Sequence, residues 1–199
     1  SFTAAVKKGA MMIETDCQLT ADNGVVLWHN NVISPQDVMV DGFEERAIPA
    51  IESAELMALS LRNPKTHAPS DQHICTLDRL LTAFKTAIYY YLEIKVYDAY
   101  TEEQVHALCD KTIESVHTNG VAAHTMIVSF KPEVLEYCYA KDESLLLGLN
   151  IDDETIMRRK PTVTVQALCP DITIIEHARC QKWNRVMIPH NVNNEVDLA

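Results

Sequence analysis

Residues 9–29 read Gly-Ala-Met-Met-Ile-Glu-Thr-Asp-Cys-Gln-Leu-Thr-Ala-Asp-Asn-Gly-Val-Val-Leu-Trp-His. The apolar run that ends at Ile13 continues into two carboxylates, Glu14 and Asp16, at positions i and i+2. In a β-strand this spacing points both side chains to the same side of the sheet. Two like charges so close raise each other's pKa unless a cation or a strong donor compensates, and a divalent metal is the simplest compensation. His29, at the end of the next apolar run, could then supply acid–base chemistry.

Strand-like and helix-like segments alternate outward from this stretch. The pattern predicts strands at residues 11–19, 25–29, 88–96, 125–130, 145–149 and 185–188. It predicts helices at residues 2–8, 53–61, 76–86, 101–117 and 132–140. Residues 161–177 fit either a strand or a helix, and residues 174–183 and 193–199 could begin helices. Repeated β–α units at this spacing indicate an α/β fold with a parallel sheet, in open or barrel form.

The pattern divides the chain into no separate domains, and we expect residues 1–199 to form a single one. Residues 31–75 form a long, irregular region that holds one short helix, at residues 53–61. A connection of this length is usually functional or an inserted subdomain. We therefore expect a long loop or small insertion there.

A second charged pair, Glu93 and Lys95, repeats the i, i+2 spacing at the end of an apolar run. In a (β/α) barrel, side chains at the C-terminal ends of the strands converge on one site. Three carboxylates there, from Glu14, Asp16 and Glu93, would suit a hard cation such as Mg²⁺ or Ca²⁺. Lys95 would add a donor for an anionic group, most simply a phosphate. The alternative is that both pairs are solvent-facing positions on half-exposed strands and that His29 is structural.

Composition narrows the class of protein. The 199 residues are 47% hydrophobic, enough for one sizeable core, and carry a net charge of −11. An acidic balance without a basic cluster argues against nucleic acid and anionic membranes as main partners. No apolar run approaches the roughly 20 residues of a transmembrane helix. The six cysteines are scattered without a C-x-x-C pair, which indicates reduced thiols and a cytoplasmic location.

Residues 9–29 resemble the glycerophosphodiester phosphodiesterase family, whose pattern there is G-A-D-x-I-E-x-D-V-x-L-T-x-D-G-x-x-V-x-x-H-D. Later segments resemble the family's patterns in the correct order. They are Ser53-Ala-Glu-Leu-Met-Ala-Leu (T-x-x-E-L-x-x-L), Cys75-Thr-Leu-Asp-Arg-Leu-Leu (P-T-L-x-E-x-L), Leu92-Glu-Ile-Lys (x-E-I-K) and Ile127-Val-Ser-Phe-Lys-Pro (V-x-S-F-x-x). The resemblance covers most of the chain.

The resemblance implies a TIM barrel whose partner is a small-molecule phosphodiester substrate: it hydrolyses glycerophosphodiesters to an alcohol and glycerol 3-phosphate. Carried over position by position, it makes Glu14, Asp16 and Glu93 the metal ligands. It makes His29 one of two catalytic histidines and Lys95 a phosphate contact. The metal and Lys95 would then neutralise charge that develops on the phosphate oxygens, and His29 would move the proton.

Three differences from the family pattern matter. The opening strand, whose H-R-G motif carries the other catalytic histidine, would lie before Ser1. The closing W-T-V-N and G-V-D-G-I-x-T-D patterns would lie after Ala199. We therefore expect a TIM (β/α)8-type barrel that lacks its first and last strands in this chain. Asn30 replaces the aspartate that usually follows the histidine, which removes a carboxylate that could orient His29 or support the metal.

Two other functions stay open on the sequence alone. A phospholipase D of the sphingomyelinase type would use the same barrel and metal site on a lipid, and would need an exposed apolar or aromatic face near the site. A catalytically silent barrel would act as a binding or regulatory module. Asn30 and the absent H-R-G motif motivate this second alternative. The oligomeric state is not predicted.

Overall fold

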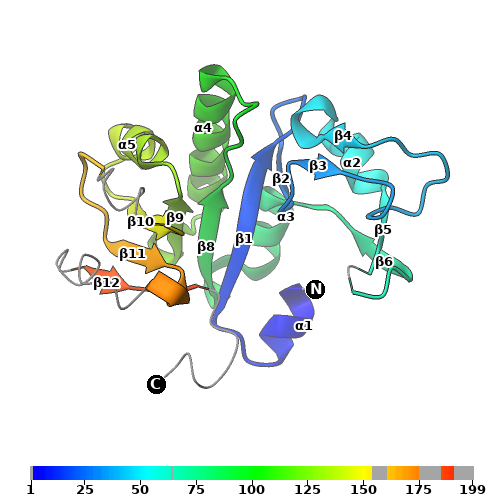
Figure 1. Cartoon of the computed structure of the whole chain (residues 1–199). Helices are drawn as coiled ribbons and strands as arrows, with labels where there is room; N and C mark the ends of the chain where they lie inside the picture. Colours follow the sequence, from blue (N-terminus) through cyan, green and yellow to red (C-terminus); the bar gives the residue numbers. More distant parts are fainter. Residues whose placement is uncertain (1, 64, 154–160, 175–184, 191–199) are drawn as a thin grey trace.

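The computed structural model describes residues 2–63, 65–153, 161–174 and 185–190 (Figure 1). The helices are α1 (Phe2–Lys7), α2 (Ser53–Ala58), α3 (Leu77–Phe84), α4 (Glu102–Thr118) and α5 (Pro132–Lys141), with short 3-10 turns η1 (Ile48–Ala50), η2 (Lys85–Ala87), η3 (Ala122–His124) and η4 (Ile172–Ile174). The strands are β1 (Met12–Leu19), β2 (Val25–Leu27), β3 (Val32–Ile33), β4 (Arg46–Ala47), β5 (Ser60–Arg62), β6 (Pro69–His73), β7 (Cys75–Thr76), β8 (Tyr89–Ile94), β9 (Thr125–Ser129), β10 (Leu146–Ile151), β11 (Ala167–Pro170) and β12 (Val186–Met187).

The described residues form one main sheet of eight strands in the order β12-β11-β10-β9-β8-β1-β2-β7. The strands from β12 to β1 run parallel to one another, and β2 and β7 are antiparallel additions at one edge. Parallel strands need crossover connections, and α4 and α5 provide two of them. The α/β class predicted from the β–α alternation is confirmed. Within the described ranges no pairing joins β12 to β7, so the sheet is open.

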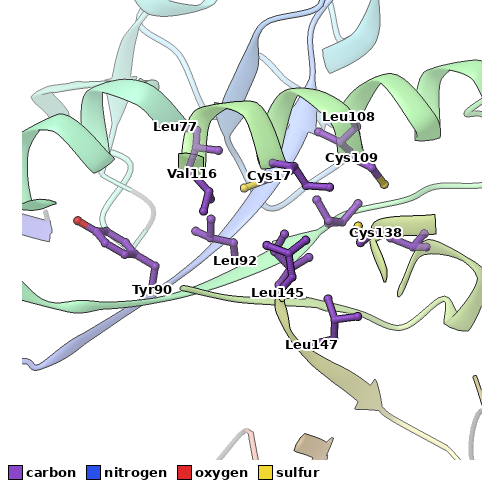
Figure 2. Packing of buried hydrophobic residues seen from close by; sticks show 14 of the residues in the cluster. Cys17, Leu77, Tyr90, Leu92, Leu108, Cys109, Val116, Cys138, Leu145 and Leu147 are labelled. Atoms are coloured by element: carbon purple, nitrogen blue, oxygen red, sulfur yellow. The ribbon is translucent and has the colours of Figure 1, made fainter. Parts of the chain in front are cut away.

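Helices α3, α4 and α5 pack on one face of this sheet, and side chains from alternate strand positions fill the space between them. Figure 2 shows Leu108, Cys109 and Val116 of α4 packed near Leu92 of β8 and Leu147 of β10. All five side chains are fully buried. The opposite face carries the other set of alternate positions, and it is on this face that polar side chains gather.

Local sequence signals explain where α3 and α4 begin. The Thr76 side chain accepts a hydrogen bond from the backbone N–H of Arg79, three residues into α3. Thr101 and Gln104 form a complete capping box at the start of α4, in which each side chain satisfies the other residue's N–H. Thr101 is therefore the N-cap of α4, at the start of the helix predicted over residues 101–117.

The prediction of an irregular region at residues 31–75 with one short helix was wrong in part. These residues hold two small two-stranded sheets, β3/β4 and β5/β6, as well as α2, grouped at one side of the main sheet (Figure 1). They share a hydrophobic cluster with a residue of β2, Val26. Its buried members are Val26, Ile33, Val38, Ile48, Ile51, Leu56, Leu59 and Ile74. Strands of two to five residues are too short to show a period-two pattern, so the sequence did not reveal them.

Several predicted boundaries also change. The helix predicted at residues 53–61 ends at Ala58, because Leu59 has extended backbone angles and the next residues pair as β5 with β6. In the ambiguous segment at residues 161–177, the strand is β11, four residues that are all buried. The helices considered at residues 174–183 and 193–199 lie outside the described residues, apart from Ile174. No described helix has the length and apolar character needed to cross a membrane.

Candidate active site

Three carboxylates meet where β1 and β8 lie side by side. Asp16 is the direct register partner of Glu93, and Glu14 is the partner of Tyr91. Since side chains alternate along a strand, all four project from the same face of the sheet. Glu14, Asp16 and Glu93 each offer an oxygen atom, and these three atoms lie within 4.8 Å of one another. The structure thus brings together the three residues that the sequence proposed as metal ligands.

Lys95 lies directly after β8 and pairs with two of these carboxylates. Its Nζ atom is 2.8 Å from Glu93 Oε1 and 3.0 Å from Asp16 Oδ1. Burial by itself would lower the pKa of Lys95, but the hydrogen bonds and negative charges of Glu93 and Asp16 outweigh this and raise it. Lys95 is therefore a fixed positive charge at the site.

The carboxyl groups remain crowded despite this lysine. Burial, followed by the charges of Asp16 and Glu93, raises the pKa of Glu14 from 4.5 to about 7. Burial also raises the pKa of Glu93, against the opposing effect of Lys95. Glu14 is exposed where it opens onto the site, so solvent screens part of this repulsion. Three carboxylates facing one lysine carry an excess of two negative charges when ionised. The oxygen donors and this excess charge fit a hard divalent cation.

These side chains line a pocket of about 450 Å³. Its lining residues are Glu14, Asp16, His29, Tyr91, Glu93, Lys95, Phe130, Asn150 and His190. A pocket of about 530 Å³ between α1 and α3 is larger, but its lining includes none of the site's charged residues. We assign the chemistry to the smaller pocket because it gathers the perturbed titratable groups.

The sequence did not single out Asn150, which completes the site. Its Nδ2 atom donates to Glu93 Oε2 at 2.9 Å, and its Oδ1 atom accepts from the Tyr91 hydroxyl at 2.6 Å. All three side chains are buried. Asn150 was detectable in principle, because it is a polar residue near the end of an apolar strand, as Glu93 is in β8.

His190 also lines the pocket and was missed. Its ring meets that of Phe130 edge-on, with the centroids 5.9 Å apart. Burial lowers its pKa, and its Nε2 atom is buried with no hydrogen-bond partner among the described residues. The sequence around it, Ile-Pro-His-Asn, has no periodicity that would have marked it.

His29 reaches the pocket from the turn after β2. The predicted strand at residues 25–29 ends at Leu27, so His29 is exposed and outside the sheet. Its Nδ1 atom lies 3.1 Å from Asn30 Oδ1. The amide oxygen of Asn30 can accept a hydrogen bond from the Nδ1–H of His29, as a carboxylate would, although it lacks the negative charge. His29 therefore still has a hydrogen-bond acceptor beside it, although Asn30 replaces the aspartate of the family pattern.

The fold and the site together define an α/β protein with an acidic, lysine-containing pocket at the C-terminal ends of its parallel strands. A family profile described as the Glycerophosphoryl diester phosphodiesterase family matches residues 1–197. The chain therefore belongs to this family, and the enzyme class predicted from its sequence is confirmed.

Solved structures share the fold along nearly the whole chain. A Silicibacter pomeroyi protein classed as a glycerophosphoryl diester phosphodiesterase superposes with a TM-score of 0.82 at 19% identity, over 99% of this chain and 78% of its own. An Oleispira antarctica phosphodiesterase, in complex with the product sn-glycerol-3-phosphate, superposes with a TM-score of 0.76 at 17% identity, over 98% of this chain and 78% of its own. The Thermotoga maritima glycerophosphodiester phosphodiesterase superposes with a TM-score of 0.70 at 19% identity, over 98% of this chain and 79% of its own. The chain thus has the TIM-barrel type of fold of these phosphodiesterases, as predicted, and in the described residues its sheet is open, as expected for a barrel that is not complete in this chain. No curated protein matches the chain.

Proposed function

We propose that the protein hydrolyses glycerophosphodiesters to an alcohol and glycerol 3-phosphate, with the help of a divalent metal. The observation that carries the proposal is the meeting of three carboxylates, Lys95 and His29 at one pocket. The Oleispira antarctica relative supports it, since the product in that complex is sn-glycerol-3-phosphate.

Glu14, Asp16 and Glu93 would hold the cation, either Mg²⁺ or Ca²⁺. When bound, such a cation would polarise the phosphate and offset negative charge that develops on its oxygens. Asn150 supports this role because it fixes one oxygen of Glu93 by a hydrogen bond and leaves the carboxylate's other oxygen to Lys95.

Lys95 would bind the phosphate, and His29 would move the proton. The ammonium group of Lys95 lies in the same pocket as the carboxylates, so an anionic substrate group could share it. His29 borders the pocket at its exposed side, where it can protonate a leaving alkoxide or take a proton from the nucleophile. Asn30 would hold the imidazole in the tautomer with Nδ1 protonated, which leaves Nε2 for this transfer.

The test is ³¹P NMR of glycerophosphocholine with the wild-type chain, in Mg²⁺ or Ca²⁺ and in excess chelator. We expect glycerol 3-phosphate to form only with metal, and its formation to be lost in the E93Q and H29A variants. E44Q is the matched control, because Glu44 is exposed and does not line the pocket.

Two outcomes would favour the other functions. A folded chain that binds metal without turning over any glycerophosphodiester would indicate a silent binding module. Cleavage of sphingomyelin in preference to glycerophosphocholine would indicate a phospholipase D of the sphingomyelinase type. The family assignment favours neither alternative.

We also propose that residues 1–199 form one domain with residues 31–75 as an insertion. The insertion's hydrophobic cluster includes Val26 of the main sheet, which supports a shared core. Limited proteolysis tests this: cleavage within residues 31–75 should leave the fragments associated, whereas separation would indicate independent units.

Finally, we propose a cytoplasmic location. The five cysteines within the described residues are free thiols: Cys17, Cys75, Cys109, Cys138 and Cys169. A reducing compartment would keep them so. Cell fractionation tests this, and recovery of the protein outside the cytoplasm would overturn it.

A further inference from the structure

The backbone on both sides of His29 is held by one buried side chain. Gln18 of β1 is fully buried, and its Nε2 atom donates to the carbonyl oxygens of Trp28 at 2.5 Å and Asn30 at 2.7 Å. These are the residues directly before and after His29. Because both partners are acceptors, only the NH₂ end of the amide can satisfy them, which fixes the orientation of Gln18. Its Oε1 atom is left buried without a partner among the described residues.

A third contact holds His29 itself. The hydroxyl of Tyr97, in the loop after β8, donates to the carbonyl oxygen of His29. Three consecutive carbonyls, of Trp28, His29 and Asn30, thus each accept a hydrogen bond from a side chain. The donors come from β1 and from the loop that follows β8, the two strands that carry the three carboxylates.

This arrangement is more than the turn needs. His29 and Asn30 are exposed residues, so water could satisfy part of this turn, and a fully buried glutamine that leaves one of its own oxygens unpaired is costly there. The cost is understandable if the position of the turn matters. A rotation of the residue 28–30 backbone would swing the imidazole of His29 relative to Lys95 and Glu93.

We propose that Gln18 and Tyr97 are positioning residues, which clamp the turn and thereby hold His29 over the acidic pocket. The proposal rests on the proposed function of His29. Neither side chain transfers a proton in this account. Each one acts only through the backbone that carries the histidine.

The test compares four variants. Q18L and Y97F each remove donors to the turn. Q166L is the control for a glutamine hydrogen bond in the sheet, because Gln166 Oε1 accepts from Leu147 N near the start of β10. Y89F is the control for a tyrosine hydroxyl, because Tyr89 is exposed at the start of β8. For each variant we would measure kcat and KM, the melting temperature, the amide exchange of Trp28, and the ¹⁵N signals of the His29 imidazole.

We expect Q18L and Y97F to lower kcat by about tenfold with KM little changed, which is within the roughly 100-fold cost of a ~1 Å misplacement. Amide exchange at Trp28 should accelerate in both variants, and the His29 signals should broaden. Q166L should lower the melting temperature without these effects, and Y89F should change nothing.

Two results would overturn the proposal. One is that Q18L and Y97F show the same amide exchange rate at Trp28 and the same His29 ¹⁵N signals as the wild type. The other is that Q166L, when it loses as much stability as Q18L, also loses as much kcat as Q18L. A wild-type chain without turnover would contradict the proposed function instead, and the exchange and NMR data would still decide whether the clamp exists.

Discussion

Asp16 and Glu93 are direct partners in the register of the parallel strands β1 and β8, and Lys95 bridges both of their carboxylates. This relationship defines the site, because it places acidic groups from two distant parts of the chain on one face at the same height of the sheet. Like charges directly opposite each other destabilise a sheet. Their presence here therefore indicates a site that is shaped for a cation.

Replacing Asn150 should weaken the site through Glu93. In N150L, Glu93 Oε2 loses its donor, and we expect a destabilisation of about 1–3 kcal/mol, as for other buried groups left unsatisfied. The pKa of Glu93 should rise further, so metal affinity near neutral pH should fall. Urea unfolding and calorimetric Mg²⁺ titration would measure both effects.

The variant Y91F is the milder companion of N150L. It removes only the hydroxyl that donates to Asn150, so Glu93 keeps its donor. Equal loss of metal affinity in Y91F and N150L would contradict the role given to Asn150.

Replacing Lys95 should separate substrate binding from metal binding. K95M removes the positive charge that competes with a cation for Asp16 and Glu93, so we expect metal affinity to be retained or increased. Turnover should nevertheless fall by about 100-fold, the size of effect expected for one electrostatic contact to the reacting group. K111M, which breaks only the exposed pair with Glu114, is the control. Loss of metal binding in K95M would show that Lys95 has another role.

Glu14 should make the metal-free protein sensitive to pH. Its pKa rises from 4.5 to about 7 on folding, so the folded state holds this proton more tightly than the unfolded state does. The resulting stability is fully present below pH 4.5 and is lost as the pH rises through about 7. E14Q cannot titrate, so its stability should fall less over this range. Urea unfolding in chelator would compare them, and parallel pH profiles would refute the prediction.

Gly148 has little room for a side chain on the sheet face opposite α4 and α5. A Cβ atom there would lie 3.0 Å from Val128 Cγ1, 3.1 Å from Met126 Sδ and 3.2 Å from Cys169 Sγ. We expect G148A to be destabilised by about 1–3 kcal/mol through overpacking. G42A is strained for a different reason, its positive φ, but has open space around it. Thermal unfolding would measure both variants, and a G148A variant as stable as the wild type would contradict the predicted overpacking.

The sequence predicted the strands that carry the site because each has a clear apolar run, as in residues 89–94 of β8. It also predicted which side chains share a face, since Glu14 and Asp16 are two positions apart. The register that sets Asp16 opposite Glu93 depends on pairing between distant segments, which no local pattern encodes. The family resemblance, and not periodicity, supplied that link.

The residues that the sequence missed have no local pattern of their own that marks them as part of the site. Asn150 resembles any polar residue in a strand until its neighbours are known. His190 follows a two-residue strand. Gln18 is a polar residue, which in sequence suggests an exposed side chain. It is buried because the backbone carbonyls of Trp28 and Asn30 accept its hydrogen bonds. Such contacts depend on tertiary structure alone.

Glu14, Asp16 and Glu93 should together form a metal site. Calorimetric titration of Mg²⁺ and Ca²⁺ into the wild-type chain, E93Q and the E44Q control tests it most directly, with circular dichroism to verify folding. We predict binding to the wild-type chain and to E44Q, and its loss in E93Q. A folded wild-type chain that binds neither ion, or an E93Q variant that binds as well as the wild type, would contradict the account.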